Sequence, residues 1–452
     1  MRILLAATLL AAACSQAQPK PAPEATREAA GQRVDAGQQA ANEPGGSAMG
    51  TEDAGARQAV KDAADAGQQA AADAGQDVAG GIKQGASEAA GNVASGTKEA
   101  AQNVAQGASE AGRAVADAGA KAVSAAGTAA SDLAEALQKL PPAPAIPDTP
   151  MFLPAVEEPR ENPTTPEKVW LGYELFFDKR LSKDGSMSCE SCHHPEQAWT
   201  SGNATDPKVG GGPNKRNAPT MENVAYYHSF YWDGRAPTME AVSAAAWKGQ
   251  LGADPDPVAA KLNAIGGYRA QFQRAFKEDA TGKNVPMALA AFLRALKTGN
   301  APWDKFEQGE GDAVSMEARR GYRVFQKARC TLCHVPPLYT DAEFHNVGVG
   351  YDKPEAERDH GRMDASKDPK DDGKFKTPTL RDIAKTAPYF HDGSVSSLSE
   401  AVDFMVKGGI KNPNRDEKLK PSRLSAKDRK ALQAFLESLT GTPTYTKAPE
   451  LP

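Results

Sequence analysis

The spacing of apolar side chains separates the chain into a sparse first part and a second part with strong helical periodicity. Beyond residue 150, apolar residues recur three or four positions apart, and no segment sustains the alternation typical of a half-buried strand. This pattern predicts a mainly α fold with long connecting loops. The expected helices cover 166–177, 257–277, 284–298, 315–329, 398–405 and 425–439.

The residues at two expected helix starts support these boundaries. Thr165 precedes Pro166, the order of an N-cap followed by proline at the first helical position. Ser425 is followed three residues later by Asp428, so the two side chains could cap the last helix reciprocally. The chemistry of these helix ends therefore agrees with the periodicity.

Residues 15–140 consist largely of Ala, Gly, Gln, Asp, Glu and Lys, and they predict an extended tether. Larger apolar residues fall eleven positions apart, at Ile82, Val93, Val104 and Val115, which keeps one thin stripe on a helical face. Each glycine inside a helix costs roughly 1 kcal/mol relative to alanine. The stripe is too small to bury a core, so we expect a helical or disordered spacer. Binding of a partner or of peptidoglycan remains an alternative role.

The first residues of the chain have the pattern of an export signal peptide, in which a basic residue is followed by an apolar run. Met1-Arg2 is followed by an apolar run from Ile3 to Ala13, which is too short to span a bilayer. The run ends at Cys14 in a string that resembles a bacterial lipobox, so a lipid anchor at Cys14 is expected. Ordinary cleavage and release is the alternative. Both place the mature protein outside the cytoplasm, and a periplasmic, membrane-anchored lipoprotein is the prediction.

Length and charge limit the remaining possibilities. At 452 residues the chain is long enough for two or three segments of domain size. The net charge of −5 and the pI of about 5.9 give no basic region, so nucleic acid is not an expected partner.

Four of the five cysteines lie in two C-x-x-C-H strings, Cys189 to His193 and Cys330 to His334. This is the attachment signature of a c-type haem. Two thiols one turn apart, Cys189 with Cys192 and Cys330 with Cys333, can each bond one vinyl group of the porphyrin. The adjacent His193 or His334 then ligates the iron as the proximal ligand. A redox or zinc dithiol is the alternative, but two copies in an exported chain favour two haems.

The ligand on the side of each iron opposite the proximal histidine decides the function of that haem. The second half of the chain contains several candidates for this distal ligand. They are Met363, Met405, His345, His360 and His391. Met405 lies in the expected helix 398–405, where ordinary core packing is the alternative role for a methionine.

Four further strings resemble motifs of the bacterial di-haem cytochrome c peroxidase family, which includes the MauG-like enzymes. The similarity covers about residues 152–445 and none of the repeat region. The strings are 171–178, 216–220, 230–236, and 377–381 continuing into 386–393. The resemblance implies two cytochrome c-like haem domains, each with one covalently bound haem c.

The resemblance also implies roles for single residues. Met405 matches the distal ligand of a high-potential electron-transfer haem, where MauG-like members have tyrosine, and a thioether raises the potential. Trp232 matches the tryptophan between the two haems, although it could also be a buried core aromatic. Asn217, Thr386 and Pro388 match positions that supply oxygen atoms to a calcium ion between the haems.

The chain departs from the family around the first haem. Many members close this site with a second histidine, but none occurs between His194 and Asn217, so the site is expected to be open. His194 is expected to lie at the surface or beside a haem propionate, and His228 is a reserve candidate for the capping ligand.

The distal pocket also differs from the family pattern. The family's glutamine position falls on Val242 and its glutamate position on Gln250. An amide cannot accept and return a proton, so Glu240 or Asp254 could substitute, or peroxidase activity could be weak.

We therefore expect a di-haem peroxidase that reduces hydrogen peroxide at the first haem, with Trp232 and Gln250 as catalytic residues. Electrons would come through the second haem from a small cytochrome c or cupredoxin, and family members commonly form homodimers. The alternatives are a MauG-like oxidase of a partner protein side chain and a tethered, non-enzymatic electron-transfer cytochrome. The expected organisation is a signal segment 1–14, a tether and linker 15–150, a peroxidatic haem domain 151–310, an electron-transfer haem domain 311–446 and a tail 447–452.

Overall fold

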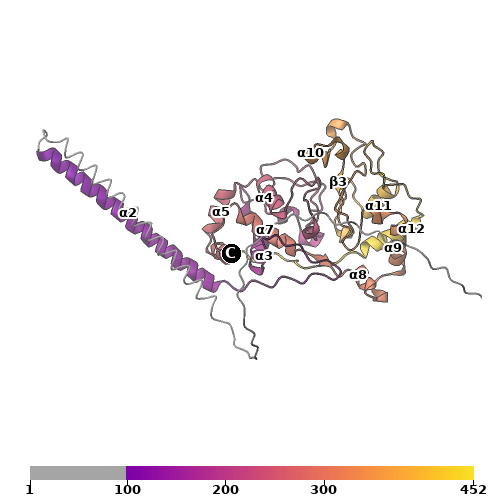
Figure 1. Ribbon diagram of the computed structural model, residues 1–452, viewed down its shortest axis with the longest axis horizontal. Coiled ribbons are helices and arrows are strands. Elements are labelled where there is room, and N and C mark those ends of the chain that lie inside the picture. Colours follow the sequence, from indigo (N-terminus) through magenta and orange to yellow (C-terminus); the bar gives the residue numbers. More distant parts are fainter. Residues whose placement is uncertain (1–97) are drawn as a thin grey trace, which may run out of the picture. The chain divides into compact units, whose positions relative to one another are not determined.

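The computed structural model describes residues 98–452 (Figure 1). The expected export signal, the lipidation site Cys14 and most of the repeat region lie outside these residues. The described helices are α2 (Lys98–Lys139), α3 (Pro166–Phe177), α4 (Met239–Gly249), α5 (Pro255–Asn263), α6 (Gly266–Phe276), α7 (Asn284–Ala295), α8 (Pro302–Glu307), α9 (Met316–Lys327), α10 (Met363–Ser366), α11 (Leu398–Val406) and α12 (Ala426–Glu437). The described strands are β1 (Thr298–Gly299), β2 (Phe344–His345), β3 (Phe375–Lys376) and β4 (Thr442–Pro443).

The described part is therefore mainly helical, and its strands have two residues each. The caps expected from the sequence are present at α3 and α12: Thr165 accepts a hydrogen bond from Lys168 N, and Ser425 and Asp428 form a capping box. The end of the repeat region is helical as α2, and Val115 on this helix is 44% exposed. None of the helices described is both long and apolar enough to cross a membrane.

The helix predicted over 257–277 is wrong as a single element, because the structure divides it into α5 and α6. Ile265 has an extended backbone between them, and α6 begins at Gly266 and Gly267. Glycine is a poor helix former. A Cβ atom at Gly267 would lie 2.7 Å from the Cβ atom of Pro452, so a larger residue here would have to displace Pro452.

The first hydrophobic core is built on the contact between α3 and α7. Gly172 allows this contact, because a Cβ atom there would lie 2.0 Å from the carbonyl oxygen of Ala288. Phe176, Trp199 and Phe292 then meet with ring centroids 5.4–5.7 Å apart. The helix that precedes the first C-x-x-C-H string is thereby fixed against the core.

The second core repeats this arrangement between α9 and α12. A Cβ atom at Gly321 would lie 1.9 Å from the carbonyl oxygen of Ala431. In each half the glycine faces an alanine whose helix carries a phenylalanine four residues later, Phe292 in the first and Phe435 in the second. The helix before the second C-x-x-C-H string is fixed in the same way as the helix before the first.

A buried ion pair lies beside the second core, and the returning C-terminal segment packs on the first. Arg381 and Asp304, which are 1% and 2% exposed, form two parallel hydrogen bonds of 2.8 and 2.9 Å. Their chain neighbours Leu380 and Trp303 belong to the second core. Strand β4 pairs antiparallel with β1. Tyr445, just after β4, then packs against Phe292 of the first core, with ring centroids 5.3 Å apart.

Candidate functional site

The first C-x-x-C-H string forms a short 3-10 helix, Glu190–Cys192, that places two cysteines one turn apart. His193 follows directly and is half-buried, and the burial of its ring lowers its pKa. Its Nδ1 lies 2.8 Å from the carbonyl oxygen of Trp199. A carbonyl only accepts, so Nδ1 donates and Nε2 is the nitrogen left to bind a metal.

The second string has the same local geometry. Cys330–Leu332 form a 3-10 helix, and the Nδ1 atom of His334 donates to the carbonyl oxygen of Tyr339 over 2.9 Å. Burial lowers the pKa of His334 as well. Both histidines are thus held as the neutral tautomer that ligates iron through Nε2.

The thiols do not have the properties of a reactive dithiol. Burial raises the pKa of Cys189, Cys192 and Cys330 to about 12. Reactive cysteines instead have lowered pKa values, because the thiolate is the nucleophile. All four cysteines of the two strings are unpaired with one another. These features argue against a redox dithiol and fit attachment through thioether bonds.

A cavity of about 520 Å³ lies beside the first string and is lined by Cys189, Cys192 and His193. It is mostly apolar, and segments from both cores contribute to its wall. Six residues singled out from the sequence line it together: Trp232, Val242, Gln250, Asn217, Thr386 and Pro388. Met405 is not part of this wall, and it lies half-buried on α11.

Helix α4 supplies one side of the cavity. Met239, Val242 and Ala246 recur at helical spacing on the face that lines it, and Gln250 follows as the C-cap residue. The Oε1 atom of Gln250 is buried and has no hydrogen-bond partner among the described residues. An unsatisfied buried acceptor is costly, so this oxygen is available to a donor inside the cavity.

Glu240 does not take the place of the missing glutamate. Its carboxylate accepts hydrogen bonds from Arg294 at 2.7 Å and from Asn162 at 2.8 Å. Burial alone would raise the pKa of Glu240, but these bonds outweigh burial and lower it. Neither Glu240 nor Asp254 lines the cavity. The structure therefore does not support Glu240 or Asp254 as a replacement for the family's glutamate.

The indole of Trp232 is held by the segment that carries Asn217. Its Nε1 atom donates to the carbonyl oxygen of Asn217 over 2.9 Å. The backbone nitrogen of Asn217 donates in turn to His391, and its side chain donates to the carbonyl oxygen of Asn203. Two of the sequence motifs are thereby fixed to each other at the cavity.

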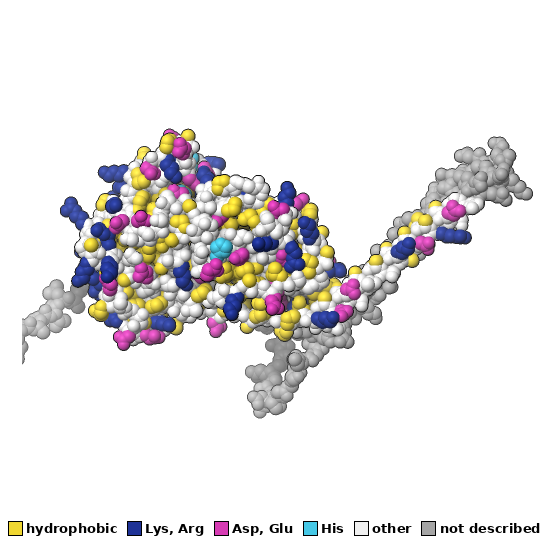
Figure 2. Space-filling model, turned by 180° about the vertical axis from the view of Figure 1, so that it is seen from behind, with side chains coloured by type: hydrophobic (Ala, Val, Ile, Leu, Met, Phe, Trp, Pro, Cys, Tyr) yellow, Lys and Arg dark blue, Asp and Glu magenta, His cyan; other side chains and the backbone are white. Residues whose placement is uncertain are grey.

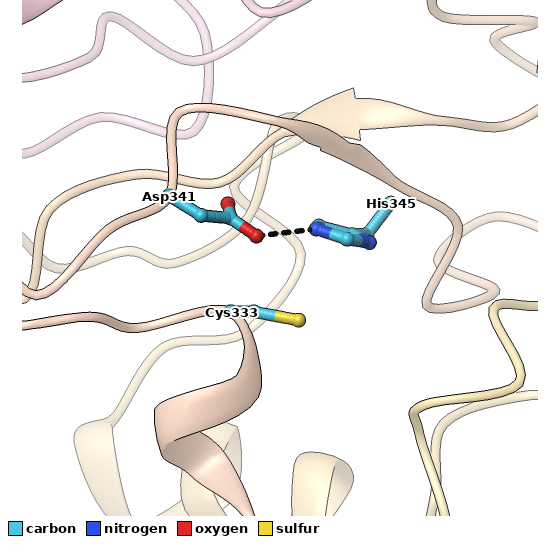
Figure 3. Close-up of side chains that lie close together, drawn as sticks. All are labelled: Cys333, Asp341 and His345. Atoms are coloured by element: carbon cyan, nitrogen blue, oxygen red, sulfur yellow. Dashed lines mark hydrogen bonds and ion pairs between the residues drawn. The ribbon is translucent and has the colours of Figure 1, made fainter. Parts of the chain in front are cut away.

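The histidines of the second half are mostly engaged elsewhere. His345 lies beside Cys333 and Asp341 (Figure 3), with Nε2 2.9 Å from Asp341 and Nδ1 2.5 Å from Asp416. Burial alone would lower the pKa of His345, but its hydrogen bonds outweigh this and raise it to about 10. Because Cys333 belongs to the second C-x-x-C-H string, this cluster is part of the haem attachment site.

The remaining histidine candidates are also accounted for. His360 bonds to Asp372 at 2.6 Å, and His391 is buried in a stack on Phe375 with ring centroids 3.5 Å apart. His194 lies 3.2 Å from Glu190, and His228 is exposed and does not line the cavity.

The cavity is also lined by the buried Lys376, which was not predicted from the sequence. No local sequence signal marks it, because its neighbours Tyr227 and Phe230 lie about 150 residues away in the chain.

The comparisons with known proteins agree with this geometry. The family model described as "Di-haem cytochrome c peroxidase" matches residues 166–312. The methylamine utilization protein MauG of Methylorubrum extorquens is 38% identical over 315 residues, covering 66% of this chain and 85% of that protein. The chain belongs to the di-haem cytochrome c peroxidase family. Its resemblance to this family, inferred from four strings around the two C-x-x-C-H sites, is confirmed.

Other relatives of this di-haem peroxidase carry peroxidase names. The cytochrome-c peroxidase IdrP1 of Denitromonas iodatirespirans is 36% identical over 335 residues, covering 66% of this chain and 89% of that protein. Among solved structures, a MauG-like protein associated with microbial copper homeostasis is 32% identical, with a TM-score of 0.62 over 65% of this chain and 95% of that chain. The protein is therefore an oxidoreductase of the peroxidase type, with the MauG-like reaction as its alternative.

Two c-type haems are the cofactors of this family, and the residues present fit both attachment sites. Each site offers two thiols one turn apart and a histidine with Nε2 left free. At the first site the adjoining cavity provides apolar space within the range usual for cofactor sites.

Proposed function

We propose that this di-haem peroxidase reduces hydrogen peroxide at the haem attached through Cys189 and Cys192, with His193 as the proximal ligand. The single observation that supports this most is the cavity beside His193, whose wall carries Gln250 and no histidine other than His193. Bound there, haem iron supplies the redox chemistry that breaks the O–O bond. The balanced reaction consumes one peroxide, two electrons and two protons and yields two water molecules.

The cavity wall would orient the substrate. The free Oε1 atom of Gln250 can accept a hydrogen bond from peroxide, while Val242 and Ala246 on the same face keep the neighbourhood apolar. Gln250 cannot transfer the proton itself. Protons would therefore reach the peroxide from solvent, which makes a slow peroxide reaction the expected consequence.

Electrons would enter at the second haem, held by Cys330, Cys333 and His334 with Met405 as distal ligand. A His/Met pair favours the reduced iron and suits acceptance of electrons from a small cytochrome c or a cupredoxin. Trp232 would carry electrons between the haems, because its indole is fixed at the shared cavity. Met405 in place of tyrosine favours this direction over MauG-like oxidation of a partner protein.

Several finer assignments belong to the same proposal. The haem domains would be 151–310 and 311–446. Most of the first hydrophobic core lies in the first range and most of the second core in the second, but Trp303 of the first range belongs to the second core. Asn217, Thr386 and Pro388, which share one cavity wall, would supply oxygen atoms to a calcium ion between the haems. The signal segment and Cys14 would place the protein in the periplasm on a lipid anchor, and the chain would form homodimers.

Mixing the holoenzyme with peroxide and a reduced small cytochrome c in a stopped-flow instrument separates the candidate functions. Peroxidase function predicts a spectral change at the first haem, followed by stoichiometric oxidation of two cytochromes per peroxide. A haem change without cytochrome oxidation would instead indicate the MauG-like reaction. A first haem that does not respond to peroxide would identify an electron-transfer cytochrome and would contradict the proposal.

A further inference from the structure

Lys376 carries a buried charge whose role the proposed reaction does not explain. This residue on β3 is only 8% exposed and lines the cavity beside His193. Its backbone nitrogen donates to the carbonyl oxygen of Trp232 over 2.8 Å, which fixes it next to the proposed electron path. A buried ammonium group is costly unless it is paired.

The protein satisfies only part of the bonding capacity of this ammonium group. An ammonium has three N–H donors, and Nζ donates to a single acceptor, the carbonyl oxygen of Ser229, at 2.7 Å. The rings of Tyr227 and Phe230 lie 3.9 and 5.7 Å away and offer a weak cation–π attraction.

No carboxylate among residues 98–452 forms an ion pair with Lys376. Asp233 is the acid that attracts it electrostatically, but Arg216 and Arg235 already bind Asp233 at 2.6 and 2.9 Å. Burial accordingly lowers the pKa of Lys376 to about 7. An anion in the cavity would compensate the buried charge and use the free donors.

The haem brings such an anion with it. The porphyrin of a c-type haem has two propionate side chains, and the cavity lined by its attachment cysteines is also lined by Lys376. We propose that Lys376 binds a propionate carboxylate of the haem attached at Cys189 and Cys192. The inference rests on haem attachment at the first site, and it holds whether or not peroxide is the substrate.

Two measurements on the ferric holoenzyme test this role without relying on turnover. Resonance Raman spectra report the propionate bending bands, which shift when a hydrogen bond to the carboxylate is lost. Redox titration reports the midpoint potential of each haem. The variants are Lys376→Met, which removes the charge, and Lys376→Arg, which keeps it. Lys374→Met is the matched control, because Lys374 is two residues away but pairs with Asp371 at 3.0 Å and does not line the cavity.

We expect Lys376→Met to shift the propionate bands and to lower the potential of the first haem, because a nearby cation stabilises the reduced iron. Lys376→Arg should preserve most of both properties, and Lys374→Met should match the wild type. If Lys376→Met loads haem poorly, Lys376→Gln is measured in the same way. Unchanged bands and potentials in the charge-removing variant, or a shift confined to the second haem, would overturn the proposal. Slower peroxide reduction with unchanged bands would also overturn it, since Lys376 would then act on the substrate.

Discussion

Gln250→Glu should accelerate the reaction of the ferric enzyme with hydrogen peroxide. The substitution places a carboxyl group at the one polar position on the cavity face of α4, where Gln250 Oε1 has no partner. A positioned acid and base contributes about 10²- to 10⁴-fold to a proton-transfer step, and we expect at least about a tenfold gain in the second-order rate constant. Stopped-flow absorbance of the first haem measures it.

Gln250→Leu is the matched variant, because it keeps the approximate size of the side chain and removes its hydrogen bonding. It should react more slowly than the wild type. A rate that is the same in the wild type and in both variants, at equal haem content, would show that peroxide does not meet this side chain.

Arg381→Met should cause the largest loss of stability of any single substitution discussed. It would leave the carboxylate of Asp304 buried without its partner, and breaking a buried ion pair in this way costs about 3–5 kcal/mol. Urea titration of the holoprotein measures the free energy of unfolding. Arg429→Met is the control, because Arg429 and Asp403 are each 41% exposed and pair at 3.3 Å. An exposed pair contributes about 0–1 kcal/mol.

A double variant separates the lost partner from the lost packing. Asp304→Leu added to Arg381→Met removes the uncompensated charge and should recover part of the stability. Equal losses in Arg381→Met and Arg429→Met would contradict the role assigned to the buried pair. The comparison would also show whether Arg381, the last residue of the 377–381 motif, serves to stabilise the fold.

The features that depend on local chemistry were predictable from the sequence. The N-caps at Thr165 and Ser425 require only neighbouring residues, and so does the placement of two cysteines on one turn before His193. The position of Gln250 on the Val242 face of α4 likewise follows from helical spacing.

The features that depend on distant segments were not predictable. Gly267, just after the break between α5 and α6, lies against Pro452, and the ion pair that turns Glu240 away from the cavity requires Arg294, which comes from another helix. The burial of Lys376 likewise arises where β3 lies against Trp232. In each case the deciding contact joins residues far apart in the chain, and periodicity and motif spacing carry no information about such contacts.

The face of the molecule that Figure 2 displays carries charges of both signs. Acidic and basic side chains are interspersed over most of it, and several basic side chains gather at its left edge. An electron-donor protein that docks on this face would therefore meet a surface of mixed charge.

The spin state of the first haem in the resting ferric enzyme tests the central claim most directly. The claim is that the iron bound by His193 is open to peroxide without prior reduction. Electron paramagnetic resonance of the isolated holoenzyme should then give one high-spin signal from the first haem and one low-spin signal from the second, which Met405 would ligate. Two low-spin signals would mean that a protein side chain closes the first iron, and they would contradict this account.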